Sequence, residues 1–488
     1  MYWTTTLTGT TVRSGPRSSG WSASSTTSSS CRGSLPGPPP PTRPVDPSGR
    51  RGHCGFVRRE AVWEYLRGAL WVFPTIAVVV ALAVGFALSQ VEVSSTSRFV
   101  FQGTPDDART LLIAIASTLA TVIALVLGLT VVALQLASTQ FSPRLLRNFL
   151  RDRINQVVLS IFVATFTYST AGLFTVGVEA GRRVQDYPRL AVSFALVLLF
   201  VSLLMLVFFV HHLAHSIQID EVMRSVERST LRVIEHDLPS EGVTAEPAPW
   251  PPAGSVMVPA YDSGYVQAVH PEMLLRLSRE RDVVAAVAVM VGEYVVQGAP
   301  LLWLWGPTPD ARAPDPAPFR AHLPGAVRVG FERTAEQDVA FGVRQLADIA
   351  VKALSPAIND PYTAIQSLEH LGVLLATLVR RPLGSQCLSD ASGALRVVIP
   401  GRDLSYYLDL ATGQIRRYGC AEPRVDRALL RVLATTGRFC DDPGDRRLVA
   451  DQVELVIADA ERAIVQPADL APVRAHADLV LRELAGSG

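Results

Sequence analysis

Four long stretches without a charged side chain dominate this sequence. They run over Leu70–Val91, Thr110–Ala137, Gln156–Val178 and Leu190–Leu213 and contain no Asp, Glu, Lys or Arg. Each reaches the roughly 20 residues that an α-helix needs to cross about 30 Å of hydrocarbon. A backbone in lipid must satisfy its own hydrogen bonds, so the stretches are predicted to be helices. The fold class that follows is an α-helical membrane domain with four transmembrane helices.

The remaining composition narrows the class of protein. Hydrophobic residues make up 49% of the chain and charged residues only 18%, against about 25% charged residues in a soluble protein. The formal net charge of +1 offers no basic surface for nucleic acid. The 5 cysteines include no CxxC pair, so neither a zinc site nor a disulfide framework is predicted. We expect the lipid bilayer as a partner, no nucleic-acid partner and no cofactor.

Arginines beside the spans predict the orientation in the membrane. Eleven of them flank the spans on one side, in the segments 51–67, 144–153 and 224–232, against five in the loops 98–109 and 182–189. Cytoplasmic loops carry the excess of positive charge. Both termini are therefore predicted to be cytoplasmic, in a bacterial inner membrane.

The rest of the chain divides by composition. Residues 1–57 are rich in Ser, Thr, Pro and Gly, which predicts a disordered extension; the alternative is a translation start near Val57, which would make this stretch a gene-model artefact. The four-span domain covers 58–216. A cytoplasmic α+β domain follows, mostly helical with a small β-rich module. Its predicted parts are a juxtamembrane helix and linker over 217–254, the β-rich module over 255–305, a Pro-rich loop over 306–332 and a mainly helical domain over 333–488. Within the last part we expect a strand pair near 394–399 and 404–410, and final helices near 423–437, 446–464 and 467–485.

The second span carries a stripe of small and polar residues. Ser117, Thr121, Gly128, Gln135 and Ser138 recur at helical spacing, which places them on one face. They are candidates for lining a water-filled path. The alternative is close packing with another helix, since small residues let membrane helices approach. The third span has a weaker matching stripe that includes Gln156 and Ser160, and the two stripes would then pack together without a pore.

Charged residues are missing from the spans, and this limits the transport mechanism. Without a carboxylate there is no proton relay of the usual kind, and without a ladder of arginines there is no voltage sensor. A passive channel with neutral walls passes this test, whereas a pump does not.

Two groups of residues are candidates for a cytoplasmic mouth. His211 and His215 lie one helical turn apart at the end of the fourth span, where they could sense pH or simply face headgroups. Arg144, Arg147 and Arg151 belong to an amphipathic segment, FSPRLLRNFLRDR. This segment is predicted either to lie on anionic headgroups or to ring a pore entrance.

One polar motif stands out beyond the spans, in RTAEQDVAFGVRQLADIAVKALSPAINDPYTA. Asp338, Gln345, Asp348 and Lys352 are predicted to share one helix face, with Lys352 facing Asp348. Asn359 and Asp360 follow in a turn, where Asp360 is expected to cap the next helix. A catalytic role would need Asp338, Asp348, Asn359 and Asp360 to converge in one pocket. Helix capping and an ion-paired lysine are the structural alternative.

At these residues the chain resembles a bacterial family of predicted inner-membrane proteins that is known only as a domain of unknown function. The matching stretches are VALQLASTQFSPRLLRNFLRD (132–152), SGYVQAV (263–269) and the motif over 333–364. Lys352 departs from the arginine expected there. The resemblance implies a multi-span membrane protein with a cytoplasmic domain, and it implies no particular activity.

Three functions remain open on the sequence. The first is a passive ion or small-solute channel, built as a homo-oligomer and gated by its cytoplasmic domain. The second is a non-transporting sensor or scaffold that binds a ligand or partner through that domain. A membrane-anchored enzyme is the third, and no known catalytic motif supports it.

Overall fold

The computed structural model describes most of the chain between residues 72 and 486. The described ranges are 72–90, 100–140, 153–176, 178–179, 182–183, 188–216, 218–239, 251–308 and 312–486. The side chains of 136–140 are not among them. The predicted extension over 1–57, the arginine-rich segment 141–152 and most of the predicted linker before residue 251 lie outside the described residues.

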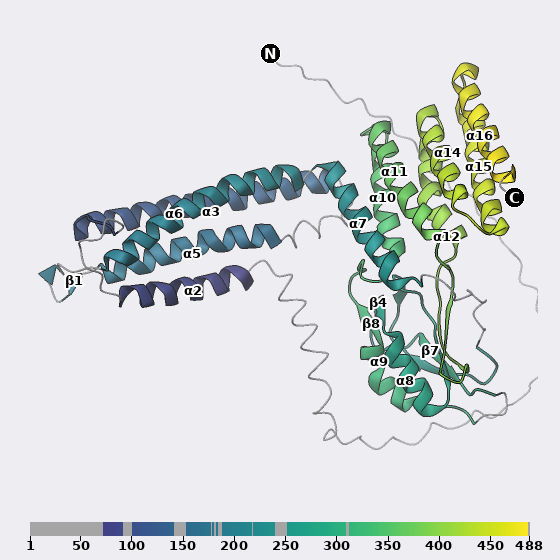
Figure 1. Cartoon of the computed structure of the whole chain (residues 1–488), viewed down its shortest axis with the longest axis horizontal. Coiled ribbons are helices and arrows are strands. Elements are labelled where there is room, and N and C mark those ends of the chain that lie inside the picture. Colours follow the sequence, from purple (N-terminus) through teal and green to yellow (C-terminus); the bar gives the residue numbers. More distant parts are fainter. Residues whose placement is uncertain are drawn as a thin grey trace, which may run out of the picture. The chain divides into compact units, whose positions relative to one another are not determined.

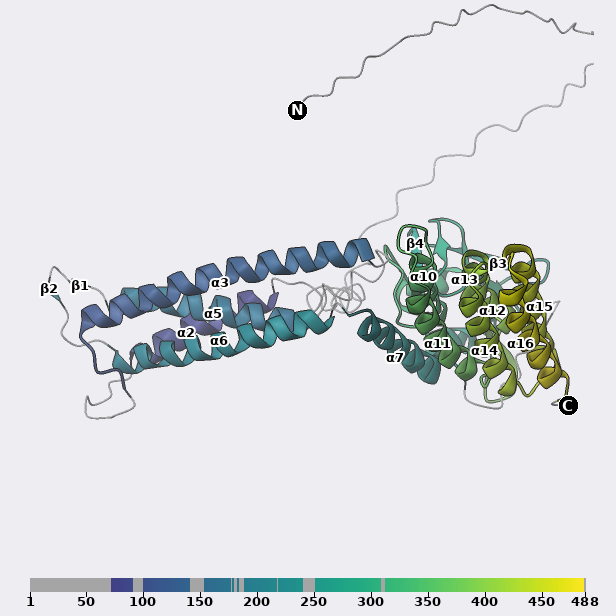
Figure 2. The same cartoon turned by 90° about the horizontal axis from the view of Figure 1, so that it is seen from above.

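Four helices of the amino-terminal part are long and apolar enough to cross a membrane. They lie side by side in Figures 1 and 2 and are α2 (Val72–Ser89), α3 (Pro105–Gln140), α5 (Arg153–Thr175) and α6 (Arg189–Ser216). We call them the span bundle. Helix α5 packs against each of the other three, around a core that includes Leu112, Phe162 and Phe209. The four predicted spans are thus present as helices.

Helix α3 is the longest of the bundle, with 36 residues. At about 1.5 Å per residue it is about 54 Å long, which exceeds the roughly 30 Å of a hydrocarbon layer. It begins before the predicted apolar run because Thr104 and Asp107 cap each other. The Thr104 N–H donates to Asp107 Oδ2 over 2.9 Å, and the Asp107 N–H donates to Thr104 Oγ1 over 3.2 Å. A short hairpin of β1 (Val178–Glu179) and β2 (Arg182–Arg183) precedes α6.

Helix α7 (Ile219–Asp237) belongs to a second, helical core rather than to the span bundle. It packs against α10 (Val339–Ala353) and α11 (Pro361–Leu378). Gly342 lies so close to α7 that an added Cβ would overlap the Thr230 side chain. On the α11 side, His370 Nδ1 and Glu227 Oε2 are 2.5 Å apart. The predicted juxtamembrane helix is therefore fixed to α10 and α11, which come about 100 residues later in the chain.

The same core continues to the end of the chain. Its elements are α12 (Leu404–Leu408), a π-helical turn (Asp409–Gly413), α13 (Gln414–Gly419), α14 (Pro423–Arg438), α15 (Pro443–Ala463) and α16 (Pro467–Gly486). Helix α14 contacts α11 on one side and α15 and α16 on another. We call α7 and α10–α16 the helical module. The three final helices predicted from the sequence are confirmed.

The strand predicted over 404–410 is wrong, because this stretch is helical. Asp403 begins the helix by accepting a hydrogen bond from the Tyr406 N–H over 2.8 Å. The buried positions that follow are spaced by three and four residues, which is the period of a helix; they are Leu404, Tyr407, Leu408, Ala411 and Ile415.

The strands form two sheets, which with α8 and α9 we call the β module. The larger sheet has the order β3-β7-β5-β10-β9 and the smaller one β6-β4-β8. Strand β10 is parallel to β5, and the other pairs are antiparallel. The bounds are β3 (Val256–Pro259), β4 (Gly264–Val269), β5 (Val284–Val287), β6 (Tyr294–Val295), β7 (Pro300–Trp305), β8 (Val327–Gly330), β9 (Gln386–Ser389) and β10 (Leu395–Ile399).

The β module extends beyond the predicted range 255–305. The predicted loop over 306–332 contains α9 (Ala317–Ala326) and then β8, which pairs with β4. Helix α8 (Pro271–Arg281) contacts α9. The many prolines of this stretch led to the prediction of a loop, although its apolar residues Phe319 and Leu323 are buried in the core of the β module. The strand expected near 394–399 is confirmed as β10, and its hairpin partner is β9.

Candidate functional site

The inner face of α3 is apolar and packs on the bundle. Its buried residues recur every three, four or seven positions, and they are Ala108, Leu112, Ile115, Leu119, Val126 and Ala133. At about 100° per residue, these positions fall within about 40° of one direction. This is the side on which α3 contacts α5.

The predicted pore-lining residues lie on the opposite side of α3. Ser117, Thr121, Gly128 and Gln135 are all exposed in the single chain. On the same 100° spacing they fall about 180° from the buried positions. A Cβ added at Gly128 would meet no atom within 4 Å. The fifth predicted residue, Ser138, is on α3, and its side chain lies outside the described residues.

The outer faces of α2 and α6 have a different composition. They present large apolar side chains, including Phe86 at 70% exposure, Phe200 at 67% and Val207 at 70%. Such faces match the acyl chains of a bilayer. On α3, by contrast, exposed leucines such as Leu125 and Leu127 border a strip of small and polar residues. We call this strip, Ser117–Thr121–Gly128–Gln135, the α3 polar strip.

The polar residues of α5 face inward, so the two polar stripes do not pack against each other within the chain. Gln156 is fully buried, and neither its amide oxygen nor its amide nitrogen has a hydrogen-bond partner. Thr165 Oγ1 and Ser202 Oγ are 3.0 Å apart and link α5 to α6. The contact between α3 and α5 is instead made by apolar residues. Among the described residues of the span bundle, the α3 polar strip therefore has no partner helix.

The predicted mouth residues are described only in part. Arg144, Arg147 and Arg151 lie outside the described residues. His211 and His215 are exposed on α6, with ring centroids 4.2 Å apart. The Nδ1 atom of His215 is 2.9 Å from the backbone oxygen of His211. Among the described residues, no three His, Cys, Asp or Glu side chains are grouped so that they could hold a metal ion.

The polar motif over 333–364 builds helix ends. Asp338 is the N-cap of α10 and accepts the Phe341 N–H over 3.0 Å. Asp360 is the N-cap of α11, as predicted, and accepts both the N–H and the hydroxyl of Thr363. Because α10 separates them, Asp338 and Asp360 lie roughly 20 Å apart. The convergence that a catalytic site would need is not present.

The shared face predicted for the motif is also different in the structure. Asp338 lies before the helix rather than on it, and Gln345 is buried at 3% exposure. Asp348 pairs with Arg344 over 2.8 Å, while Lys352 is half-buried in the last turn of α10. Asn359 takes the left-handed conformation, with φ 50°, and completes the turn between α10 and α11.

A buried ionic cluster was not found by reasoning on the sequence. Arg333 Nε and Nη2 donate to the Asp338 carboxylate over 2.6 and 3.1 Å, and Arg402 Nη1 lies 4.0 Å from Asp338 Oδ1. Gly292 lies against this carboxylate, which leaves no room for a side chain, and its φ of 86° also favours glycine. The three ionic residues are separated by up to 69 positions, which is why local patterns missed them.

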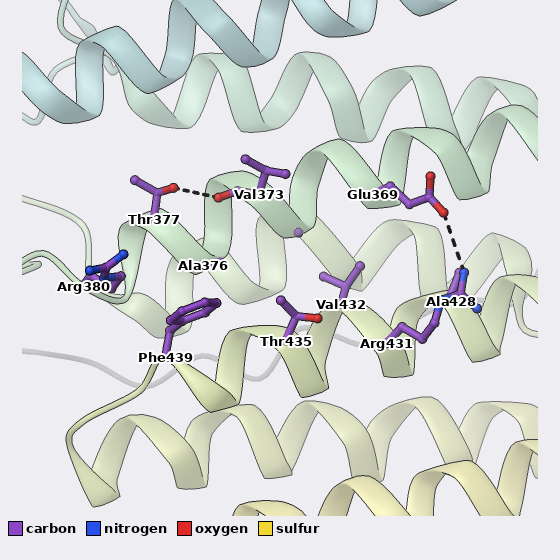
Figure 3. Close-up of a pocket in the computed structure, with 11 residues that line it drawn as sticks. Glu369, Val373, Ala376, Thr377, Arg380, Ala428, Arg431, Val432, Thr435 and Phe439 are labelled. Atoms are coloured by element: carbon purple, nitrogen blue, oxygen red, sulfur yellow. Dashed lines mark hydrogen bonds and ion pairs between the residues drawn. The ribbon is translucent and has the colours of Figure 1, made fainter.

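A groove of about 480 Å³ opens between α11 and α14. Figure 3 shows Val373, Ala376 and Val432 along it, with Glu369 and Arg431 at one end and Arg380 and Phe439 at the other. Glu369 and Arg431 are 3.9 Å apart, and the Arg380 guanidinium lies 5.7 Å from the Phe439 ring centre. The groove is a mainly apolar surface, and its charged side chains are engaged at the two ends.

Comparison with known proteins assigns the chain to a protein family. Residues 67–435 match the family described as "Predicted membrane protein (DUF2254)". The chain belongs to this family. It is 43% identical over 424 residues to an uncharacterised protein of Mycobacterium tuberculosis and, to the same extent, to one of Mycobacterium bovis. These alignments cover 85% of this chain and 81% of each relative. No solved structure matches the chain. The family match agrees with the resemblance found in the sequence and brings no activity with it.

Proposed function

We propose that this member of the DUF2254 family is a passive channel for ions or small solutes, formed by several copies of the chain around an axis. The observation that carries the proposal is the α3 polar strip, which is exposed and points away from the core of its own bundle. In such an assembly the strip from each copy lines a shared aqueous path.

The physical argument is the cost of a polar face in lipid. Transfer of an amide such as that of Gln135 to an apolar medium costs about 2–7 kcal/mol when it makes no hydrogen bond. The α2 and α6 outer faces avoid this cost with large apolar side chains. Facing a water-filled axis removes it for the α3 polar strip, because water supplies the hydrogen bonds. The apolar run of α3 carries no charge, so the path has neutral walls and needs no coupled energy source.

We propose further that the protein lies in the bacterial inner membrane with both termini in the cytoplasm. The excess of arginines on one side of the spans supports this orientation. The β and helical modules would then be cytoplasmic and available to gate the path. Cysteines placed at Asp106 and at Arg182 should react with a membrane-impermeant reagent added from outside. Protection of both would reverse the orientation.

Conductance of the purified protein in planar bilayers tests the channel. Wild-type protein should give single-channel currents, and Gln135→Leu should lower the single-channel conductance, because it replaces a water-binding group in the lining. Val207→Leu on the exposed face of α6 is the matched control and should leave it unchanged. Absence of current over a wide range of salt and pH would contradict the channel.

Cross-linking tests the assembly separately from the current. Thr121→Cys should form disulfide-linked dimers in membranes, because the proposal brings the α3 polar strips of neighbouring copies together. Val207→Cys, whose side chain faces lipid in this assembly, should not. Cross-linking at Thr121 without any current would favour the second function, an oligomeric sensor or scaffold in which the strip packs on a neighbour and leaves no pore.

A further inference from the structure

A partly open cavity of about 250 Å³ lies where the end of α7 meets the β module. Its lining comes from several parts of the chain that are distant in sequence. They include the last residues of α7, Val269 and Pro271 around the start of α8, Val291, Gln337, and the segment 399–402. The wall at 399–402 is held tightly, because the Gly384 N–H donates to the Arg402 oxygen over 3.0 Å. A Cβ at Gly401 would overlap the Gly384 backbone.

Arg402 supplies a positive charge to this cavity. Its side chain is 9% exposed, and its Nη1 donates to the Val291 oxygen over 2.8 Å. Its Nε is buried and has no hydrogen-bond partner among the described residues. The nearby carboxylate of Asp338 already accepts two hydrogen bonds from Arg333, so the charge of Arg402 is only partly compensated. A guanidinium can bind a carboxylate through two parallel hydrogen bonds.

Asp237 supplies a negative charge to the same cavity. It is the last residue of α7 and is half-buried. Burial raises the pKa of its carboxyl, and the neighbouring His236 opposes this shift. The carbonyl groups at the end of α7 add to the negative potential there. In the described part of the chain, Asp237 and Arg402 do not approach within the 4.0 Å of an ion pair, although both line the cavity.

Asp237 and Arg402 carry opposite charges and line the same cavity without forming an ion pair. A ligand with one positive and one negative group could therefore bind to both of them. We propose that this cavity binds a free α-amino acid, with its carboxylate on Arg402 and its ammonium group on Asp237. The remaining lining includes Leu238, Val339 and Ile399, which favours an apolar side chain. The volume equals about eight water-sized groups, which fits a leucine-sized ligand and excludes a nucleotide. This proposal does not depend on the channel, because binding is measured without any current.

Binding to the full-length protein in detergent tests the site. L-leucine is the probe, and isocaproate and isoamylamine are its matched analogues without the ammonium or the carboxylate. L-leucine should raise the Tm with increasing concentration, and each analogue should bind about 10- to 100-fold more weakly, because each leaves one charged partner unbound. The remaining standard L-amino acids complete the panel.

Substitutions distinguish a loss of ligand binding at this site from a general loss of protein stability. Asp237→Asn removes a half-buried charge, so it should keep or raise the Tm of the free protein while weakening L-leucine about 10- to 100-fold. Glu235→Gln, an exposed residue of the same helix, is the matched control and should bind like wild type. Arg402→Lys keeps the charge but loses the planar set of donors that matches a carboxylate, and it should also weaken binding.

Two results would overturn the proposal. One is the absence of a Tm shift with every standard L-amino acid. The other is unchanged L-leucine affinity in Asp237→Asn, or isocaproate binding as tightly as L-leucine, since either result would mean that the cavity recognises a carboxylate alone.

Discussion

Asp426 provides a test of how burial controls stability in the helical module. It lies in the first turn of α14 with no exposed surface. Neither carboxylate oxygen has a hydrogen-bond partner. Burial, reinforced by the charge of Glu422, raises the pKa of this carboxyl from 3.8 to about 7. Replacing it with asparagine removes the ionisable group and keeps the shape of the side chain.

The sign of the effect follows from proton binding. Between about pH 4 and pH 7 the folded protein holds a proton on Asp426 that the unfolded chain has released, so wild-type stability falls as pH rises through this window and levels off above it. The shift of about three units corresponds to at most about 4 kcal/mol. Asp426→Asn should therefore match wild type below about pH 4, exceed it by about 1–2 kcal/mol at about pH 5 and exceed it by about 2–4 kcal/mol at about pH 8.5.

Thermal unfolding of the purified protein at these two pH values measures the difference. A domain of this size gains about 2–4 °C in Tm for each kcal/mol, so the variant should melt about 4–16 °C higher at the alkaline pH. Asp451→Asn changes an exposed carboxyl of α15 and should show no such pH dependence. The reasoning fails if Asp426→Asn melts at or below the wild-type temperature at alkaline pH, or if the difference is the same at both pH values.

Three further substitutions test contacts in the same part of the protein. Gly342→Ala should destabilise it by about 1–3 kcal/mol, because the new Cβ overlaps Thr230; the second change Thr230→Gly should restore part of the loss in a denaturation experiment. Asp338→Ala leaves the buried charges of Arg333 and Arg402 without their carboxylate and should cost about 3–5 kcal/mol, and a loss below about 1 kcal/mol would contradict this. Asp360→Ala removes the cap of α11 and should cost about 1 kcal/mol at neutral pH. Hydrogen bonding to Thr363 lowers the pKa of Asp360, so its stabilising effect is present above about pH 4 and is lost as pH falls further.

Local patterns in the sequence predict well where helices form. They predict poorly which residues pack against each face of a helix. The uncharged runs predict four span-length helices, and the pair Asp360–Pro361 predicts the start of α11. Periodicity also shows that Ser117 and Gln135 share a face, because this depends only on their spacing. It does not say whether that face points into the bundle or away from it, since this is decided by contacts with α5, whose buried residues are distant in sequence.

The same limit applies to the sites beyond the spans. The motif over 333–364 attracted a catalytic hypothesis because its acidic residues are close in sequence, yet most of them end or begin helices. The cavity beside Arg402 depends on residues from 236 to 407. Neither the left-handed turn at Gly292 nor the unpaired Nε of Arg402 has a local signature, because both arise from the way distant segments meet.

The attachment of α7 has a mechanical consequence. Helix α6 ends at Ser216 and α7 begins at Ile219. A translation or rotation of the last turn of α6 is therefore transmitted to α7 through a connection of two residues. Helix α7 cannot move separately from α10 and α11, because Thr230 packs against the backbone at Gly342 and Glu227 contacts His370. A movement of α6 should therefore displace α7, α10 and α11 together as one rigid unit.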